Sequence, residues 1–165
     1  MGLHIIATGG TFDKHYDPIG GTLGFEKSHL PEILQTARLV EETSFEIVSL
    51  VDSLDMGEQE RLAVLQACQK CSEQRIVVIH GTDTMQETAR IIGQAQLDKC
   101  IILTGAMVPY SVRDSDALFN LGAAVTASTL LEQGTWVVMN GRALPWHSVR
   151  KDKERGIFIS QNNRV

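Results

Sequence analysis

Short apolar runs that alternate with amphipathic stretches constrain the fold of this chain more than any other feature of its sequence. Continuous runs of β-branched and aliphatic residues are typical of strands that are buried on both faces of a parallel sheet. Five runs have this character: 3–8, 45–51, 76–79, 100–104 and 135–140. Because strands that alternate with helices form parallel sheets with right-handed crossovers, the sequence predicts an α/β fold. We expect a three-layer, open and mostly parallel sheet, flavodoxin- or Rossmann-like, with helices on both faces.

The stretches between these runs have the spacing of helices that pack one face against a sheet. The expected helices run from Ser28 to about Leu39, from Gly57 to Cys71, from Thr84 to Gln96 and from Asp116 to Leu131. Their expected buried faces contain Leu62, Ala63, Leu65 and Ala67, then Ala89, Ile92 and Gly93, and finally Ala117, Leu121, Ala124 and Leu131. Ser28 is expected to cap the first helix, and Thr84 and Glu87 have the spacing of a capping box.

Two segments lack such a pattern. Residues 12–27 contain three glycines, two aspartates and one proline. A loop of that length inside a compact domain is often a functional lid. The chain is less regular after residue 141, and a hairpin is expected there only within residues 149–159. With 165 residues and no linker or repeat, residues 1–165 are expected to form a single domain.

Polar side chains follow three of the predicted strands at their carboxyl ends. They are Thr11 after Gly9 and Gly10, Ser53 and Asp55 after the second strand, and Thr82 and Asp83 after the third. In a sheet of order 2-1-3-4-5, the first and third strands are neighbours and the chain reverses direction between them. We therefore expect these side chains to meet at that switch point. The alternative for Thr82 and Asp83 is that they only cap the following helix.

The combination of hydroxyl groups and carboxylates indicates acyl transfer from an amide. A threonine hydroxyl is a weak nucleophile that needs a base or an electropositive neighbour. Glycines before Thr11 allow the tight turn that brings its hydroxyl to the site. Asp83 can bind an ammonium group or orient a lysine, and a partly desolvated lysine beside Thr82 can hold or take its proton. A small zwitterion fits such a site, because acids bind its amino group while hydroxyl and backbone N–H groups bind its carboxylate.

Composition excludes several classes of function. A net charge of −5 disfavours nucleic acid and anionic membranes as partners. The first residues have neither a basic segment nor a long apolar run, so we expect no signal peptide and a cytoplasmic location. The glycines before Thr11 match neither G-x-G-x-x-G nor the phosphate-binding P-loop, and Asp13 would place a carboxylate near any phosphate. A nucleotide or flavin binder of flavodoxin type is therefore disfavoured, and no cofactor is expected.

The cysteines and histidines also predict no metal site. Cys68 and Cys71 form a C-x-x-C pair, but it lies late in a predicted helix and no second pair follows. The five histidines have no paired spacing such as H-E-x-x-H. An odd, sparse set of cysteines is typical of a reducing compartment.

Several motifs resemble the signature motifs of the bacterial-type L-asparaginase family. They are Ala7-Thr8-Gly9-Gly10-Thr11, the run His80-Gly81-Thr82-Asp83-Thr84-Met85-Gln86-Glu87-Thr88-Ala89, Leu103 to Pro109, and Val137 to Asn140. The similarity extends over nearly the whole chain in the same order. It implies cofactor-free hydrolysis of L-asparagine to L-aspartate and ammonia by a cytoplasmic homodimer or homotetramer.

The resemblance also implies roles for individual residues. Thr11 corresponds to the nucleophile that forms a β-acyl-enzyme, and Thr82, Lys151 and Asp83 resemble the family's Thr-Lys-Asp catalytic group. Lys153 is a rival for the position of the lysine in the same mixed charge run. Ser53 matches the binder of the substrate carboxylate and Asp83 the binder of the α-amino group. Tyr16 corresponds loosely to the lid tyrosine, and Gly10 and Asp55 complete the expected substrate-binding set.

The chain departs from the family pattern at two points. Leu54 stands where many members have a polar residue that contacts the substrate amino group, and losing one such hydrogen bond costs roughly 1.5–3 kcal/mol. The sequence resembles a short, single-domain form that corresponds to the N-terminal domain of the two-domain enzymes. We therefore expect a higher KM than those enzymes have. A broader enzyme that also accepts L-glutamine and a catalytically weak asparagine-binding regulatory domain are the alternatives.

Overall fold

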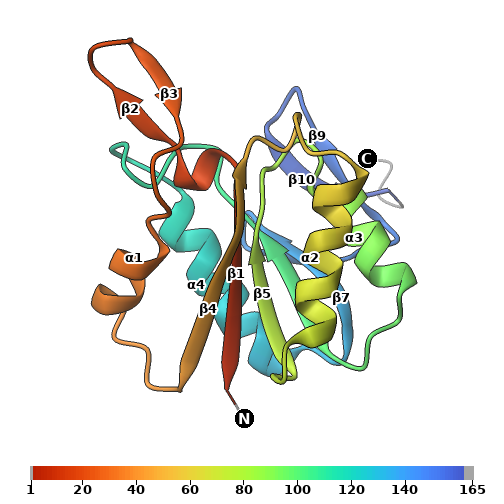
Figure 1. Cartoon of the computed structure of the whole chain (residues 1–165). Coiled ribbons are helices and arrows are strands. Elements are labelled where there is room, and N and C mark those ends of the chain that lie inside the picture. Colours follow the sequence, from red (N-terminus) through yellow and green to blue (C-terminus); the bar gives the residue numbers. More distant parts are fainter. Residues whose placement is uncertain (1, 162–165) are drawn as a thin grey trace.

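A six-stranded sheet forms the centre of the computed structural model, which describes residues 2–161 (Figure 1). Its strand order is β4-β1-β5-β6-β7-β8. The parallel strands are β1 (Leu3–Gly9), β4 (Thr43–Val51), β5 (Arg75–Ile79), β6 (Cys100–Thr104) and β7 (Gly134–Met139). Taken in chain order, these five strands have the predicted 2-1-3-4-5 arrangement, and the expected α/β fold class is confirmed.

Alternation along the strands divides the core into two layers, one on each face of the sheet. Leu3, Ile5 and Ala7 of β1 pack with α1 (Leu30–Thr36) and α4 (Ala117–Leu130) on one face. On the other face, Ile6 of β1 packs with α2 (Glu58–Lys70) and α3 (Met85–Gln94). Successive side chains of a strand point to opposite faces, so one apolar run supplies both layers.

The helix faces agree with the prediction for α3 and differ from it for α2. Ala89, Ile92 and Gly93 of α3 are buried as expected. In α2 the buried side chains are those of Arg61, Val64 and Cys68, whereas Leu65 and Ala67 are partly buried and Leu62 is 40% exposed. The buried stripe of α2 thus contains an arginine, which an apolar pattern does not predict. In α4, Ala117, Leu121 and Ala124 are buried and Leu131, just past the helix, is partly buried.

The segment expected to be an irregular loop contains regular structure. Thr11–Asp13 forms a short 3-10 helix, and β2 (His15–Asp17) pairs with β3 (Thr22–Gly24) in an antiparallel hairpin that projects from the body of the molecule (Figure 1). The prediction missed the hairpin because its strands are very short and largely exposed, so they have no alternation of apolar and polar residues.

The end of the described chain forms two further strand pairs. The unpredicted strand β8 (Arg142–Pro145) runs antiparallel to β7 at the edge of the sheet. The expected hairpin within 149–159 is present as β9 (Val149–Asp152) and β10 (Ile157–Ser160).

Two predicted helix caps are wrong. His29, not Ser28, precedes α1, which ends at Thr36, although the Ser28 hydroxyl accepts a hydrogen bond from the N–H of Leu30. Thr84 precedes α3 but its side chain does not cap that helix. The capping arrangement occurs instead at α2, where the Glu60 carboxylate accepts the N–H of Gly57.

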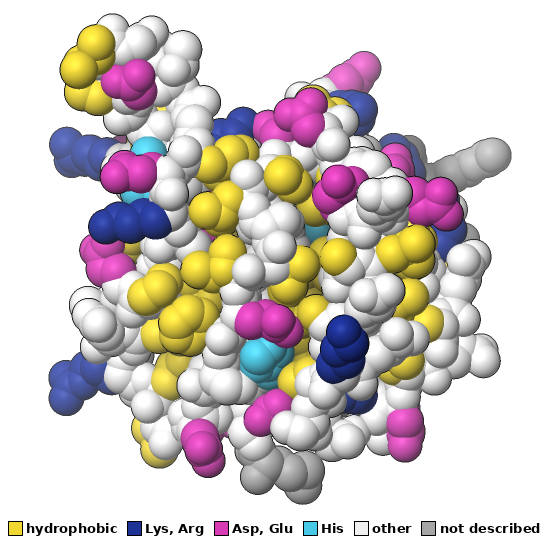
Figure 2. Space-filling view, in the orientation of Figure 1, with side chains coloured by type: hydrophobic (Ala, Val, Ile, Leu, Met, Phe, Trp, Pro, Cys, Tyr) yellow, Lys and Arg dark blue, Asp and Glu magenta, His cyan; other side chains and the backbone are white. Residues whose placement is uncertain are grey.

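The positively charged side chains on one face of the molecule are dispersed (Figure 2). Lys and Arg side chains are scattered over the described part of the face that carries β4 and α2, and they do not form a continuous patch there (Figure 2). Among the described residues, no helix combines the length and hydropathy that crossing a bilayer requires.

Gly93 provides a test of the packing between α3 and the segment after β8. A Cβ atom at Gly93 would lie 2.3 Å from the Trp146 ring. We expect Gly93→Ala to lower the free energy of unfolding by about 1–3 kcal/mol through overpacking, although alanine favours helices. Gly122→Ala in α4 is the matched control, because no atom beyond its chain neighbours and its own helix backbone lies within 4 Å of its Cβ position. It should raise stability by up to about 1 kcal/mol in urea unfolding, and equal effects of the two variants would contradict this packing.

Candidate functional site

Three strand ends meet where the backbones of Gly10 and Gly81 touch. A Cβ atom on Gly10 would lie 2.4 Å from the Cα of Gly81, and one on Gly81 would lie 2.5 Å from the Cβ of Ser53. Gly10 also has a φ of 67°, in the left-handed region that favours glycine. Glycine is therefore required at both positions for β1, β4 and β5 to approach this closely. Thr11 and Thr82 each follow one of the touching glycines.

Lys151 links the turn after β5 to the β9–β10 hairpin. Its Nζ atom lies 2.8 Å from the Thr82 hydroxyl oxygen and 2.8 Å from Oδ1 of Asp83. The Lys151 side chain is only 6% exposed, whereas the Asp83 side chain is 37% exposed. The predicted rival, Lys153, is exposed in the turn of the hairpin. The structure thus brings Thr82, Asp83 and Lys151 together and leaves Lys153 outside the cluster.

Gln86 fixes the backbone of Lys151. Its side-chain oxygen accepts the N–H of Lys151 at 3.0 Å, and Gln86 lies in the first turn of α3. The same helix that follows Thr82 and Asp83 therefore positions the strand that carries the lysine. The ammonium group is consequently held between a hydroxyl and a carboxylate that come from one turn.

Ser53 is almost fully buried against the same turn. The Thr84 hydroxyl donates to the Ser53 carbonyl at 2.8 Å, and the Ser53 hydroxyl accepts the N–H of Thr84 at 3.4 Å. These bonds explain why Thr84 does not cap α3: its side chain holds the loop after β4 instead. Ser53 is 2% exposed and Thr82 is 5% exposed.

Arg61 is an organising residue that the sequence did not reveal. Its guanidinium donates to the Thr84 hydroxyl, to the Thr88 hydroxyl and to the Met56 carbonyl at 3.1, 2.8 and 3.0 Å. It also pairs with Glu87 at 3.1 Å. Buried arginine is rare unless its donors are paired, and here one side chain joins α2, the loop after β4 and α3. The Glu87 carboxylate thus forms an ion pair with Arg61 and does not form the predicted capping box.

His80 is neutral and hydrogen-bonds the backbone of the turn after β5. Its Nδ1 lies 2.8 Å from the Gly81 carbonyl, which can only accept, so Nδ1 carries the proton. Its Nε2 then accepts the Thr88 hydroxyl at 2.8 Å. Complete burial lowers the pKa of His80 to about 4, and the nearby Arg61 acts in the same direction.

The loop after Thr11 is anchored on both sides. Asp13 is buried and accepts the Ser28 hydroxyl and the His29 N–H, both at 2.8 Å. Burial outweighs these hydrogen bonds and raises the pKa of the Asp13 carboxyl. Lys14 bonds Asp52 at 2.5 Å, and this bond lowers the pKa of Asp52. The segment that carries Thr11 is thereby tied to the loop that carries Ser53.

Three other residues singled out in the sequence have exposed side chains. Tyr16 is 60% exposed on the projecting β2–β3 hairpin, and Leu54 is 67% exposed beside Ser53. Asp55 is exposed, and its N–H bonds the Asp52 carbonyl. Of the predicted set, the structure therefore gathers Gly10, Ser53, Thr82, Asp83 and Lys151, and places Thr11 next to Gly10.

The cysteines are unpaired thiols. Burial raises the pKa of Cys68 to about 12 and that of Cys71 to about 11. Cys68 lies on the buried face of α2 and packs in the core, which agrees with a structural role for that half of the C-x-x-C pair.

Comparison with known proteins finds a family model, related sequences and solved structures that match nearly the whole chain. A family model described as "Asparaginase, N-terminal" matches residues 2–162. L-asparaginase 2 of Escherichia coli strain K12 is 32% identical over 163 residues, which cover 89% of this chain and 45% of that protein. A glutamyl-tRNA(Gln) amidotransferase polypeptide of Methanococcus vannielii is 31% identical over 146 residues, or 84% of this chain and 34% of that protein.

A solved structure titled as a probable cytoplasmic L-asparaginase from Campylobacter jejuni superimposes with a TM-score of 0.85. It is 27% identical, and the match covers 98% of this chain and 53% of that one. The chain thus spans about half or less of the length of these relatives.

His80 predicts a pH dependence of stability. In the unfolded chain, His80 takes up a proton below its ordinary pKa of 6.5, whereas in the native state it stays neutral down to about pH 4. The free energy of unfolding should therefore fall by about 3 kcal/mol from this residue as the pH drops through that range. In urea unfolding across the same range, His80→Asn should lose this part of the dependence. His147→Gln, which changes an exposed histidine, should keep it, and an unaltered dependence in His80→Asn would contradict the assignment.

Proposed function

The chain belongs to the asparaginase family, and from this we propose that it hydrolyses L-asparagine to L-aspartate and ammonia. One observation carries the proposal most directly. Lys151 contacts both the Thr82 hydroxyl and the Asp83 carboxylate at the carboxyl edge of the sheet, and the Gly10–Gly81 contact places Thr11 at the same edge. A threonine nucleophile near a second threonine whose hydroxyl is held by a lysine and an acid suits acyl transfer from an amide.

The proposed reaction has two steps through an ester on Thr11. The Thr11 oxygen attacks the side-chain amide carbon, the hydroxyl proton passes to the leaving nitrogen, and the C–N bond breaks to release ammonia. Water then attacks the β-acyl ester, the C–O bond to Thr11 breaks, and L-aspartate leaves with the threonine hydroxyl restored. We assign proton transfer in both steps to Thr82, because its hydroxyl is the one held by Lys151 and, through it, by Asp83.

Substrate binding is proposed for the residues around this pair. Asp83 is partly exposed and can attract the α-ammonium group, whereas the Ser53 hydroxyl and the backbone at Gly10 suit the carboxylate. Asp55 adds negative charge in the loop after β4. Tyr16 would reach Thr11 and support it if the projecting β2–β3 hairpin folded toward the site.

The proposed reaction takes place within a single domain. We propose that residues 1–165 act as one catalytic domain of the asparaginase N-terminal type. Two core layers on one continuous sheet, together with the match over residues 2–162, support this assignment.

A second candidate is a broader amidohydrolase that also uses L-glutamine. The similarity to an amidotransferase polypeptide favours it, and so does the exposed Leu54, which offers no polar group beside Ser53 to select the shorter substrate. The ratio of ammonia released from L-asparagine and L-glutamine decides between the two candidates.

The active form is proposed to be a homodimer or homotetramer in the cytoplasm. Unpaired cysteines suit a reducing compartment. Leu118, Phe119 and Leu130 of α4 expose 54%, 64% and 78% of their surface, which favours burial against a second copy. Light scattering at micromolar concentration should give a multiple of the chain mass, and a monomer would contradict this proposal.

The catalytic assignment is tested with matched substitutions. Thr11→Ala, Thr82→Val and Lys151→Met should each lower kcat for ammonia release by about 10³-fold or more, because the attacking or proton-transferring group is removed. Thr126→Ala on the exposed side of α4 and Lys153→Met in the turn after β9 are the controls, and both should retain parental rates. If Thr11→Ala and Thr82→Val kept the parental rate, the enzymatic proposal would fail and the regulatory, asparagine-binding alternative would replace it.

A further inference from the structure

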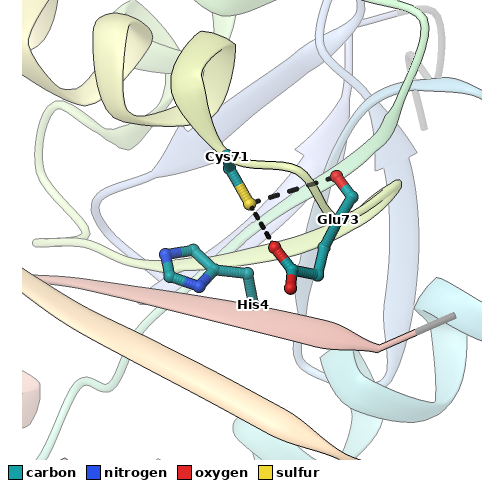
Figure 3. Close-up of side chains that lie close together, drawn as sticks. All are labelled: His4, Cys71 and Glu73. Atoms are coloured by element: carbon teal, nitrogen blue, oxygen red, sulfur yellow. Dashed lines mark hydrogen bonds between the residues drawn. The ribbon is translucent and has the colours of Figure 1, made fainter.

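Three potential metal ligands meet at the amino-terminal edge of the sheet (Figure 3). They are His4 near the start of β1, Cys71 directly after α2, and Glu73 in the connection to β5. One donor atom from each lies within 4.8 Å of the other two. Because β1 and β5 are parallel neighbours, this edge is opposite to the one that carries Thr11 and Thr82.

We propose that His4, Cys71 and Glu73 bind a Zn²⁺ ion, with water as the fourth ligand. Imidazole nitrogen, thiolate sulfur and carboxylate oxygen are the donors that Zn²⁺ takes in proteins. Zinc bond lengths of about 2.0–2.3 Å place tetrahedral ligand atoms about 3.3–3.6 Å apart. Cys71 Sγ and Glu73 Oε2 are already 3.1 Å apart. To complete the set, one imidazole nitrogen of His4 leaves its partner on β4 and turns toward them across a gap of at most 4.8 Å.

Both nitrogens of the His4 imidazole have polar partners on β4. Its Nδ1 lies 2.7 Å from the Ser44 hydroxyl and its Nε2 lies 3.2 Å from the Glu46 carboxylate. Whichever nitrogen binds the metal, the other keeps a polar partner from β4. A ligating histidine whose second nitrogen bonds a hydroxyl or carboxylate is the usual arrangement in metal sites.

The segment that carries Cys71 and Glu73 is also held in place. The Lys99 ammonium donates to the backbone carbonyls of both residues. Its positive charge opposes a bound cation, but the Glu73 and Glu46 carboxylates and the Cys71 thiolate together exceed it. In the metal-free state the Cys71 thiol donates to Glu73. Zn²⁺ displaces that proton, which passes to solvent, and the ion then joins the end of α2 to β1.

The spacing of the cysteines and histidines does not reveal this site. His4 and Cys71 are far apart in sequence, and β1 brings the histidine beside the end of α2. Binding at the native site, and not in the unfolded chain, should raise the melting temperature progressively, with the logarithm of the free Zn²⁺ concentration once that concentration exceeds Kd.

The test uses Co²⁺ and Zn²⁺ with the whole chain under reducing conditions. Co²⁺ should give a thiolate-to-metal charge-transfer band with a stoichiometry of one per chain, and Zn²⁺ should abolish it. Cys71→Ser should remove the band. His4→Gln should weaken binding by more than the roughly 10–100-fold typical of losing a second-shell partner.

Cys68→Ala, which changes the other half of the C-x-x-C pair, is the matched control and should keep the band. Absence of the band in the parent, or its survival in Cys71→Ser, would overturn the proposal. Ammonia release by Cys71→Ser should equal that of the parent, so the outcome is independent of the proposed reaction. Melting curves without metal verify that each variant folds.

Discussion

The close contact between Gly10 and Gly81 is the constraint on which the arrangement of this molecule depends. Neither backbone can approach the other with a Cβ atom in the way, and Ser53 fills the remaining space. The ends of β1, β4 and β5 are therefore fixed relative to one another by backbone contacts, independently of the functional side chains. A sheet of order 2-1-3-4-5 brings these ends together, and glycine lets them touch. The two threonines that follow the glycines take their positions from this contact.

Polar groups then hold the contact in register. Arg61 spans α2, the loop after β4 and the start of α3, and neutral His80 supports the Gly81 carbonyl. Because these groups are buried, each unsatisfied donor or acceptor would cost about 1–3 kcal/mol, so the network favours a single arrangement. Lys151 is added from the β9–β10 hairpin, which Gln86 positions. The opposite edge of the same sheet gathers nitrogen, sulfur and oxygen donors around His4, so the two edges are suited to different chemistry.

The sequence predicts the sheet and the polar ends of its strands because both depend on local patterns. Residues 76–79 are continuously apolar, and a polar turn follows at the expected edge. Arg61 could not be predicted, since the burial of a charged side chain depends on partners from three separate segments. The β2–β3 hairpin was missed because its very short, largely exposed strands have no periodicity. The position of Lys151 followed from resemblance and not from any pattern in its own charged segment.

The structure of the protein with L-aspartate bound would test the central claim most directly, since this is the product of the proposed reaction. The account predicts one ligand molecule at the carboxyl edge of the sheet. Its side-chain carboxyl should lie within hydrogen-bond distance of the Thr11 and Thr82 hydroxyls, its amino group should contact Asp83, and its α-carboxylate should contact Ser53. A ligand bound away from this edge, or Thr11 and Thr82 facing separate surfaces in the complex, would contradict it.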